Sequence, residues 1–303
     1  MLKNTLLSMA QNESVRRFVI NNPTVRGVSR RFVAGENLND ALAATEILNQ
    51  RGLHVALDYL GENVADEQEA RATALHYREI LDRIHDSSAD ANISIKLTAL
   101  GLDIARDLCD ENLTSILEHA AAFPLFVRID MEGSPYTERT MDITLRMHER
   151  FEHVGTVIQS CLYRSKKDVE QLILQGVRVR LVKGAYKEPK SVAFQLKSEV
   201  DRNYVRLMTL LLQRGNYPAL ATHDEAIIDA ACKYARNNGI SPRAFEFQML
   251  YGIRRDLQDK LVEQGYNVRV YVPYGSQWYP YLMRRMAERP ANLMFVARNA
   301  VRR

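Results

Sequence analysis

The stretch that decides the fold is LHVALDY (53–59), followed by EQEARATALHYREILDRIH (67–85) and then by NISIKL (92–97). The two outer segments are short and rich in β-branched and aromatic residues, which is typical of strands. The middle segment repeats apolar residues at helical spacing. A strand, a helix and a second strand in this order predict a parallel βαβ unit.

The same alternation continues along the chain. Six more β-rich segments follow: LFVRID (125–130), VGTVIQS (154–160), VRVRLVK (177–183), PALATH (218–223), FEFQML (245–250) and VRVYVP (268–273). The eight segments start 23 to 41 residues apart, and every gap holds a helical pattern. Eight units predict an α/β fold, a closed (β/α)8 barrel over residues 51–303, because open doubly wound sheets have only about five or six strands. Residues 1–50 read as an N-terminal helical extension.

The composition excludes several classes of protein. The chain has 303 residues, of which 46% are hydrophobic and 26% are charged, and its net charge of +4 is too small to predict nucleic-acid binding. The three cysteines lie far apart without a CxxC pair, so neither a disulfide framework nor a metal site is expected. No run approaches the length of a membrane span, and the N-terminus is too interrupted for a secretory signal.

Common cofactor and nucleophile motifs are missing. The sequence contains no GxGxxG, GxxxxGK[ST], HExxH or GxSxG. A Rossmann site, a P-loop, a zinc protease centre and an α/β-hydrolase nucleophile are therefore not expected.

Several predicted strands alternate between apolar and polar residues, although barrel strands buried on both faces should be apolar throughout. The polar face would point into the barrel, where a charge must be paired or must serve a ligand. For Arg128, Arg178 and Arg269, which lie toward strand starts, we expect internal ion pairs.

Polar residues also gather at the C-terminal ends of the strands, where barrel active sites lie. They are Asp58, Lys96, Asp130, Gln159, Lys183, Thr222, His223 and Tyr271. This concentration predicts a functional site at that rim.

Two segments contain residues that could bind a ligand or react with it. In RVRLVKGAY (178–186), Lys183 could neutralise a phosphate or form a Schiff base, or it could be a solvated lysine at a turn. In WYPYLMRRMAERPAN (278–292), Tyr281, Arg284, Arg285 and Glu288 share one helix face. The adjacent arginines could clamp a carboxylate, or they could belong to a surface helix with Arg–Glu pairs.

Together these segments resemble the proline dehydrogenase family. The matching motifs, in the family's order, are LDYLGE (57–62), SIKLTALG (94–101), RIDME (128–132), RLVKGAY (180–186), THDE (222–225), FEFQMLYG (245–252), VYVPYG (270–275) and YLMRRMAER (281–289). The resemblance implies a distorted (β/α)8 barrel that binds FAD noncovalently, with the eighth helix covering the substrate. It also implies oxidation of L-proline to Δ1-pyrroline-5-carboxylate by hydride transfer to flavin N5, the first step of proline catabolism, with electrons passed to a membrane quinone.

The resemblance also implies roles for individual residues. Asp130 and Arg180 resemble the catalytic pair, with Arg180 near the flavin N5. The substrate-binding positions are Lys96, Arg284, Arg285, Tyr271, Tyr281 and Leu250, and Glu62 resembles a gate that pairs with the first clamp arginine. The cofactor-binding positions are Met131, Gln159, Arg180, Lys183, Gly184, Ala185, Thr222 and His223.

The chain lacks the DNA-binding and aldehyde dehydrogenase regions of the family's bifunctional members, which implies a monofunctional enzyme. We expect it to be cytoplasmic, with peripheral contact at the inner face of the cell membrane where the quinone lies, and to use no metal or nucleic acid. Two other functions fit the residues alone. One is a Schiff-base aldolase that uses Lys96 or Lys183, and the other is a non-catalytic barrel that binds an acidic ligand through the arginines.

Overall fold

The computed structural model describes residues 29–288, with side chains described as far as Met283. Eight parallel strands form a closed barrel in the order β1-β2-β3-β4-β5-β6-β7-β8, and β8 pairs with β1. The strands are β1 (His54–Tyr59), β2 (Ala91–Ile95), β3 (Val127–Ile129), β4 (Val154–Gln159), β5 (Arg178–Val182), β6 (Ala219–Ala221), β7 (Glu246–Leu250) and β8 (Asn267–Tyr274). All eight predicted strands are confirmed, and so is the (β/α)8 class.

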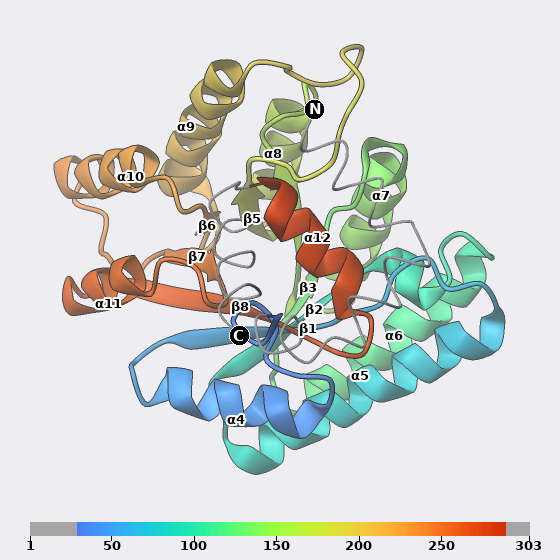
Figure 1. Ribbon diagram of the computed structural model, residues 1–303. Helices are drawn as coiled ribbons and strands as arrows, with labels where there is room; N and C mark the ends of the chain where they lie inside the picture. Colours follow the sequence, from blue (N-terminus) through green and yellow to red (C-terminus); the bar gives the residue numbers. More distant parts are fainter. Residues whose placement is uncertain (1–28, 289–303) are drawn as a thin grey trace.

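Helices connect the strands and surround the barrel (Figure 1). They are α5 (Glu67–Ser87), α6 (Arg106–Ala122), α7 (Thr137–His148), α8 (Ser165–Leu174), α9 (Lys197–Arg214), α10 (Glu225–Asn237) and α11 (Arg255–Glu263). Short 3-10 turns cover Leu97–Leu100 and Ser134–Tyr136.

Helix α5 shows how the sequence sets the boundaries of these elements. The Asp66 side chain caps its start by accepting a 2.8 Å hydrogen bond from the Glu69 amide. The helix ends where Ser88 adopts the left-handed conformation with φ 53°. Between these points Ala70, Ala74 and Tyr77 lie on its buried face, so the helix packs on the barrel through an apolar stripe.

The strands bury an apolar outer face under the helices. Val55, Leu57, Val179 and Leu181 are among the residues of this face, and all are almost completely inaccessible to solvent. Their alternating neighbours point inward, so the polar interior predicted from the sequence is present.

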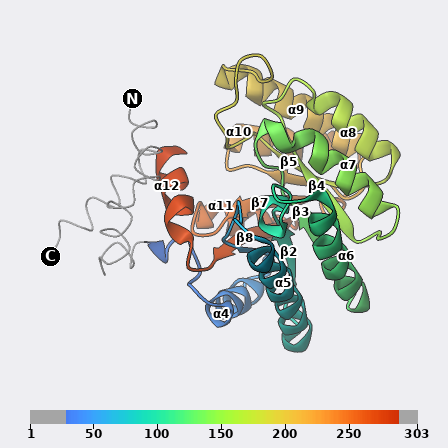
Figure 2. The same ribbon diagram turned by 90° about the vertical axis from the view of Figure 1, so that its right-hand side faces the viewer.

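Two helices at the ends of the described chain have different positions. Helix α4 (Leu38–Asn49) precedes the barrel and packs against β1 and β8 on the outside. Helix α12 (Trp278–Glu288), the eighth helix after a strand, instead lies across the C-terminal mouth (Figures 1 and 2). The mouth is therefore covered by a helix, as the sequence resemblance implies.

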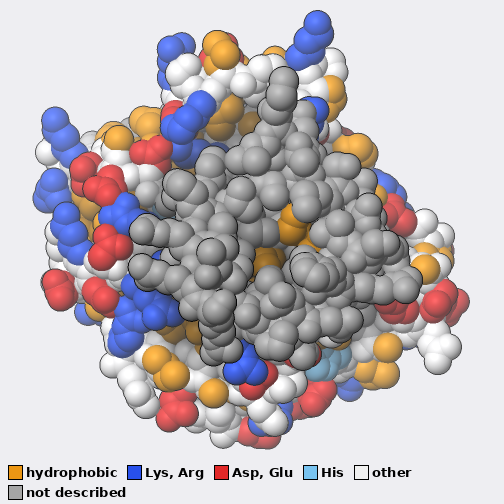
Figure 3. Space-filling view, viewed as in Figure 1, with side chains coloured by type: hydrophobic (Ala, Val, Ile, Leu, Met, Phe, Trp, Pro, Cys, Tyr) orange, Lys and Arg blue, Asp and Glu red, His pale blue; other side chains and the backbone are white. Residues whose placement is uncertain are grey.

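The described surface around the C-terminal mouth carries both positive and negative side chains. At its left edge, over α10 and α11, basic and acidic side chains alternate (Figure 3). None of the described helices is long and apolar enough to cross a membrane.

Candidate active site

A cavity of about 710 Å³ opens at the C-terminal ends of the strands. Its size is in the range of pockets that hold cofactors and small ligands, about 300 to 1,000 Å³. Thirteen of the predicted site residues line it: Lys96, Asp130, Met131, Gln159, Arg180, Lys183, Gly184, Ala185, Thr222, His223, Leu250, Tyr271 and Tyr281. The structure therefore brings together residues from seven strands or their following loops and from α12.

Three predicted residues are not among those that line the cavity. Glu62 follows β1 and is half-buried, and its charge acts on Lys96. Arg284 and Arg285 lie in α12, but their side chains are outside the described part of the structure. Their roles as gate and clamp stay predictions.

Arg180 is fixed at the base of the cavity by partners on three other strands. Its Nη1 atom lies 2.7 Å from Asp130 Oδ1 at the end of β3, and its Nη2 atom donates a 2.9 Å hydrogen bond to Ser94 of β2. Its Nε atom donates to Gln248 of β7. The guanidinium group also lies 5.2 Å from the ring centre of Tyr271. A planar cation with so many fixed partners has very little rotational freedom.

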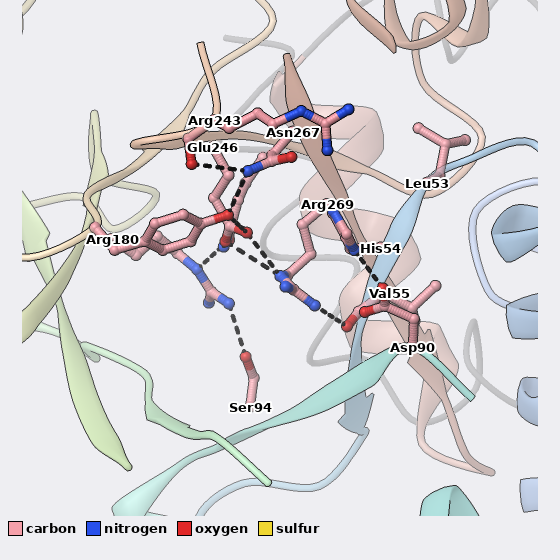
Figure 4. Close-up of polar contacts among 12 residues, drawn as sticks. Leu53, His54, Val55, Asp90, Ser94, Arg180, Arg243, Glu246, Asn267 and Arg269 are labelled. Carbon is pink, nitrogen blue, oxygen red and sulfur yellow. Dashed lines mark hydrogen bonds and ion pairs between the residues drawn. The ribbon is translucent and has the colours of Figure 1, made fainter. Parts of the chain in front are cut away.

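A chain of contacts continues from Arg180 through the barrel interior. Gln248 donates in turn to Glu246, and Glu246 accepts 3.1 Å hydrogen bonds from Arg269. Arg269 also donates to the Val55 carbonyl at 2.8 Å. Figure 4 shows Glu246 between the side chains of Arg180 and Arg269. The predicted internal ion pair of Arg269 is confirmed.

Tyr271 and Asp130 form a second part of the centre. The Tyr271 hydroxyl donates a 2.7 Å hydrogen bond to Asp130 Oδ2. Burial, together with the charges of Asp130 and Asp58, raises the pKa of Tyr271 well above its ordinary value. The phenol therefore stays protonated and acts as a donor at neutral pH.

Lys96 forms a buried ion pair with Asp58. Its Nζ atom lies 2.6 Å from Asp58 Oδ1. Burial opposes the charged form of Lys96, but the neighbouring acidic groups Asp58, Asp130 and Glu62 outweigh burial and raise the pKa above its ordinary value. A lysine held in the ammonium form can bind an anion, but it cannot attack a carbonyl as a free amine.

A cluster of paired charges lies on the β5 side of the cavity. Lys183 Nζ contacts Asp201 Oδ1 at 2.5 Å and Asp224 Oδ2 at 2.7 Å. The two lysines Lys183 and Lys197 lower the pKa of both aspartates, despite their partial burial. Lys183 is therefore a paired lysine rather than a solvated one.

Gly184 occupies a position where a side chain would not fit. Its φ is 114°, and a Cβ atom built there would lie 2.4 Å from Cys161 Sγ. The glycine therefore lets this loop pack closely against Cys161, and its backbone lines the cavity.

Two other predicted residues have fixed orientations. Gln159 donates a 2.9 Å hydrogen bond to the Glu132 carbonyl. His223 Nε2 accepts a 2.9 Å hydrogen bond from the Leu250 amide, which leaves the ring proton of a neutral imidazole on Nδ1.

Several cavity residues were not among the predicted site residues. They include Glu132, Asp224 and Gln248. Gln248 lies on a polar strand face, so the alternation could have indicated it. Glu132 accepts hydrogen bonds from Thr98, a contact between the loop after β3 and the 3-10 turn after β2 that no local pattern reveals.

The arrangement can bind an anion and can stabilise negative charge that develops beside Arg180. Among residues 29–283 no group of three or more His, Cys, Asp or Glu side chains could hold a metal ion.

Comparisons with known proteins agree with this geometry. The family model described as "Proline dehydrogenase" matches residues 41–298. The chain is 41% identical to proline dehydrogenase 1 of Bacillus subtilis subsp. natto over 303 residues, 100% of each chain. It is 43% identical to proline dehydrogenase 2 of Bacillus subtilis strain 168 over 270 residues, 89% of each. It is 41% identical to proline dehydrogenase of Deinococcus radiodurans over 280 residues, 91% of this chain and 90% of that one.

A solved structure shares the fold. Proline utilization A (PutA) from Bdellovibrio bacteriovorus superimposes with a TM-score of 0.83 at 25% identity, over 94% of this chain but only 38% of the larger protein. The fold, together with the names of these relatives, defines a barrel oxidoreductase. The chain belongs to the proline dehydrogenase family, and it matches the monofunctional bacterial members.

Proposed function

We propose that this protein oxidises L-proline to Δ1-pyrroline-5-carboxylate, with noncovalently bound FAD as the cofactor and a membrane quinone as the final electron acceptor. The observation that carries the proposal is the fixed Arg180 cation at the base of a large cavity, with Lys96 in its charged form on the same wall. The printed names of the relatives support proline as the substrate.

The cavity fits a dinucleotide cofactor in two respects. Gly184 lines the cavity with backbone alone, and the Lys183 ammonium group beside it, held by Asp201 and Asp224, would contact a phosphate. Met131, Gln159, Ala185, Thr222 and His223 would line the remainder of the cofactor site. When bound, FAD supplies the two-electron acceptor for the hydride that leaves C5 of the proline ring.

The protein's own residues position the substrate. Lys96, Arg284 and Arg285 would bind the carboxylate of proline, since cations recognise that group most strongly. Tyr271, Tyr281 and Leu250 would surround the ring. Oxidation removes a hydride from C5 and a proton from nitrogen and forms a C=N bond, so orientation of the ring matters more than a strong base. Arg180 would favour negative charge on the acceptor, because it is held beside the centre by Asp130 and Gln248.

Helix α12 would close over the substrate, with Glu62 as the gate that pairs with Arg284. We place the enzyme in the cytoplasm, in peripheral contact with the inner face of the membrane where the quinone lies.

The clamp can be tested by Arg284→Met and Arg285→Met. Each should raise KM for proline at least tenfold while FAD stays bound, and Arg236→Met on α10 is the control that should leave KM unchanged. Unchanged proline kinetics in both clamp variants would overturn the assignment.

The Schiff-base aldolase is the second candidate, and the charged state of Lys96 opposes it. Borohydride trapping of a substrate on Lys96 or Lys183 in flavin-free protein would favour it instead.

A further inference from the structure

A second cavity lies at the opposite end of the barrel from the candidate active site. Its volume is about 190 Å³, and the residues around it belong to the N-terminal ends of the strands. They include Asp90, Phe126, Arg128, Arg178, Glu246 and Arg269. The proposed proline oxidation uses none of them.

Arg128 lies in this cavity wall as a buried cation without an acidic partner. The residue is only 2% exposed, and no carboxylate of the described chain lies within ion-pair distance. Its Nη1 atom donates to the carbonyls of Thr156 at 3.1 Å and of Arg178 at 2.6 Å, and its Nε atom has no hydrogen-bond partner. The internal ion pair predicted for Arg128 is therefore wrong. Burial, with Arg180 and Arg269 nearby, lowers its pKa well below the usual arginine value.

The backbone is shaped to hold Arg128 there. A Cβ atom on Gly155 of β4 would lie 2.9 Å from Arg128 Nη1 and 2.4 Å from the Arg178 carbonyl oxygen. Only glycine at this position lets the guanidinium group cross β4 to reach β5. The fold therefore leaves room for the Arg128 guanidinium group at Gly155.

Arg178 brings a second cation to the same cavity. Its guanidinium group lies 5.3 Å from the ring centre of Phe126 and 5.4 Å from that of Tyr217. Among the described side chains it forms no ion pair, so the ion pair predicted for it is also wrong. The two arginines share the face of Phe126, whose ring centre lies 4.6 Å from Arg128.

The acidic groups in the wall already have partners. Asp90 pairs with His54 at 2.6 Å, and Glu246 pairs with Arg269 at 3.1 Å. The three arginines Arg128, Arg178 and Arg269 outnumber these two acidic groups. The wall therefore has an excess of positive charge.

We propose that this cavity binds a small oxyanion of the phosphate or carboxylate type, held by Arg128 and Arg178. Planar guanidinium groups bind such oxygens in pairs. An anion there would compensate the buried charge of Arg128, which is otherwise costly. The site lies below Arg180 and is separate from the cofactor cavity.

The test is isothermal titration of inorganic phosphate, and separately of acetate, into the purified full chain with excess FAD. Ionic strength is held constant with sodium chloride, and the excess FAD keeps phosphate out of the upper cavity. We expect one saturable site, with the stronger of the two ligands identifying the chemistry. Arg178→Gln should weaken binding about tenfold or more, because a half-exposed arginine can be replaced without loss of the fold.

Two controls define the location. Arg243→Gln removes an exposed arginine at the same end of the barrel that does not line the cavity, and it should leave the affinity unchanged. Lys190→Met should also leave it unchanged, because Lys190 is exposed in the loop after β5, at the opposite end of the barrel, and lines neither cavity. Absence of saturable binding for both anions would overturn the proposal, as would equal affinities in wild type and in a correctly folded Arg178→Gln protein.

Discussion

The hydroxyl of Tyr271 and the carboxylate of Asp130 are joined by a 2.7 Å hydrogen bond across the barrel, from β8 to the end of β3. The same carboxylate accepts from Arg180 through its other oxygen. Asp130 is thus held from two sides, and its orientation sets the position of the Arg180 cation.

The first prediction concerns this hydrogen bond. Tyr271→Phe leaves the ring in place but removes the donor to Asp130, so kcat/KM for proline should fall about tenfold, equivalent to about 1.4 kcal/mol. Steady-state kinetics measure the effect. The matched control is Tyr204→Phe, which removes another buried hydroxyl, bonded at 3.1 Å to the Leu181 carbonyl away from the cavity. A fall of equal size in both variants would show a general packing effect instead.

The second prediction concerns the absence of a side chain at Gly184. Gly184→Ala introduces a Cβ atom 2.4 Å from Cys161 Sγ, at a φ of 114°. We expect FAD affinity to fall at least tenfold, because the backbone must move where the cofactor would approach it.

Gly176→Ala is the control for this change. It has a similarly left-handed φ of 72°, but nothing lies within 4 Å of the added atom. FAD titration followed by fluorescence should separate the two variants. Normal affinity in Gly184→Ala would contradict the role of this glycine.

The third prediction concerns the reactivity of Cys161. Burial, reinforced by the charge of Glu188, raises its pKa to about 11. Only the thiolate reacts with alkylating reagents, so the rate of alkylation should still be rising at pH values above about 9. Mass spectrometry of the peptide that contains Cys161, after timed exposure to iodoacetamide, gives the profile. A plateau near neutral pH would indicate an activated thiol and would contradict this assignment.

The fourth prediction concerns Glu246 in the barrel interior. Burial opposes its charge, but Arg269 and the Gln248 hydrogen bond outweigh burial, so its pKa is lowered below the ordinary 4.5. A lowered folded-state pKa means that Glu246 stabilises the fold above the unfolded-state pKa and loses this contribution as the pH falls through the folded-state value.

Glu246→Gln should therefore lower the free energy of unfolding by about 2 to 3 kcal/mol at neutral pH. The difference from wild type should shrink at a pH below the folded-state pKa, where both side chains are neutral. Urea unfolding at both pH values measures this, and the exposed Glu149→Gln serves as a control. A difference that does not change with pH would contradict the charged role of Glu246.

The strands of the barrel and the position of the site at their ends could be predicted from the sequence, because patterns among neighbouring residues indicate both. Alternation in segments such as NISIKL locates both the strands and their inward faces. The end of each parallel strand then indicates where Lys96, Asp130 and Lys183 must gather.

The pairing of those inward side chains could not be predicted. Arg180 meets Gln248, which is 68 residues away, because three-dimensional register places both at one level of the barrel. Arg128 binds carbonyls instead of a carboxylate because Gly155 opens a path to β5. Such choices depend on barrel geometry and not on the spacing of charges.

The central claim is that the C-terminal cavity binds FAD and presents proline to it. The most direct test is the visible absorption spectrum of purified, FAD-loaded protein, recorded anaerobically before and after addition of L-proline. We predict a flavin band that bleaches with L-proline but not with glycine. A flavin band that L-proline leaves unchanged, or protein that retains no flavin when FAD is supplied, would contradict the claim.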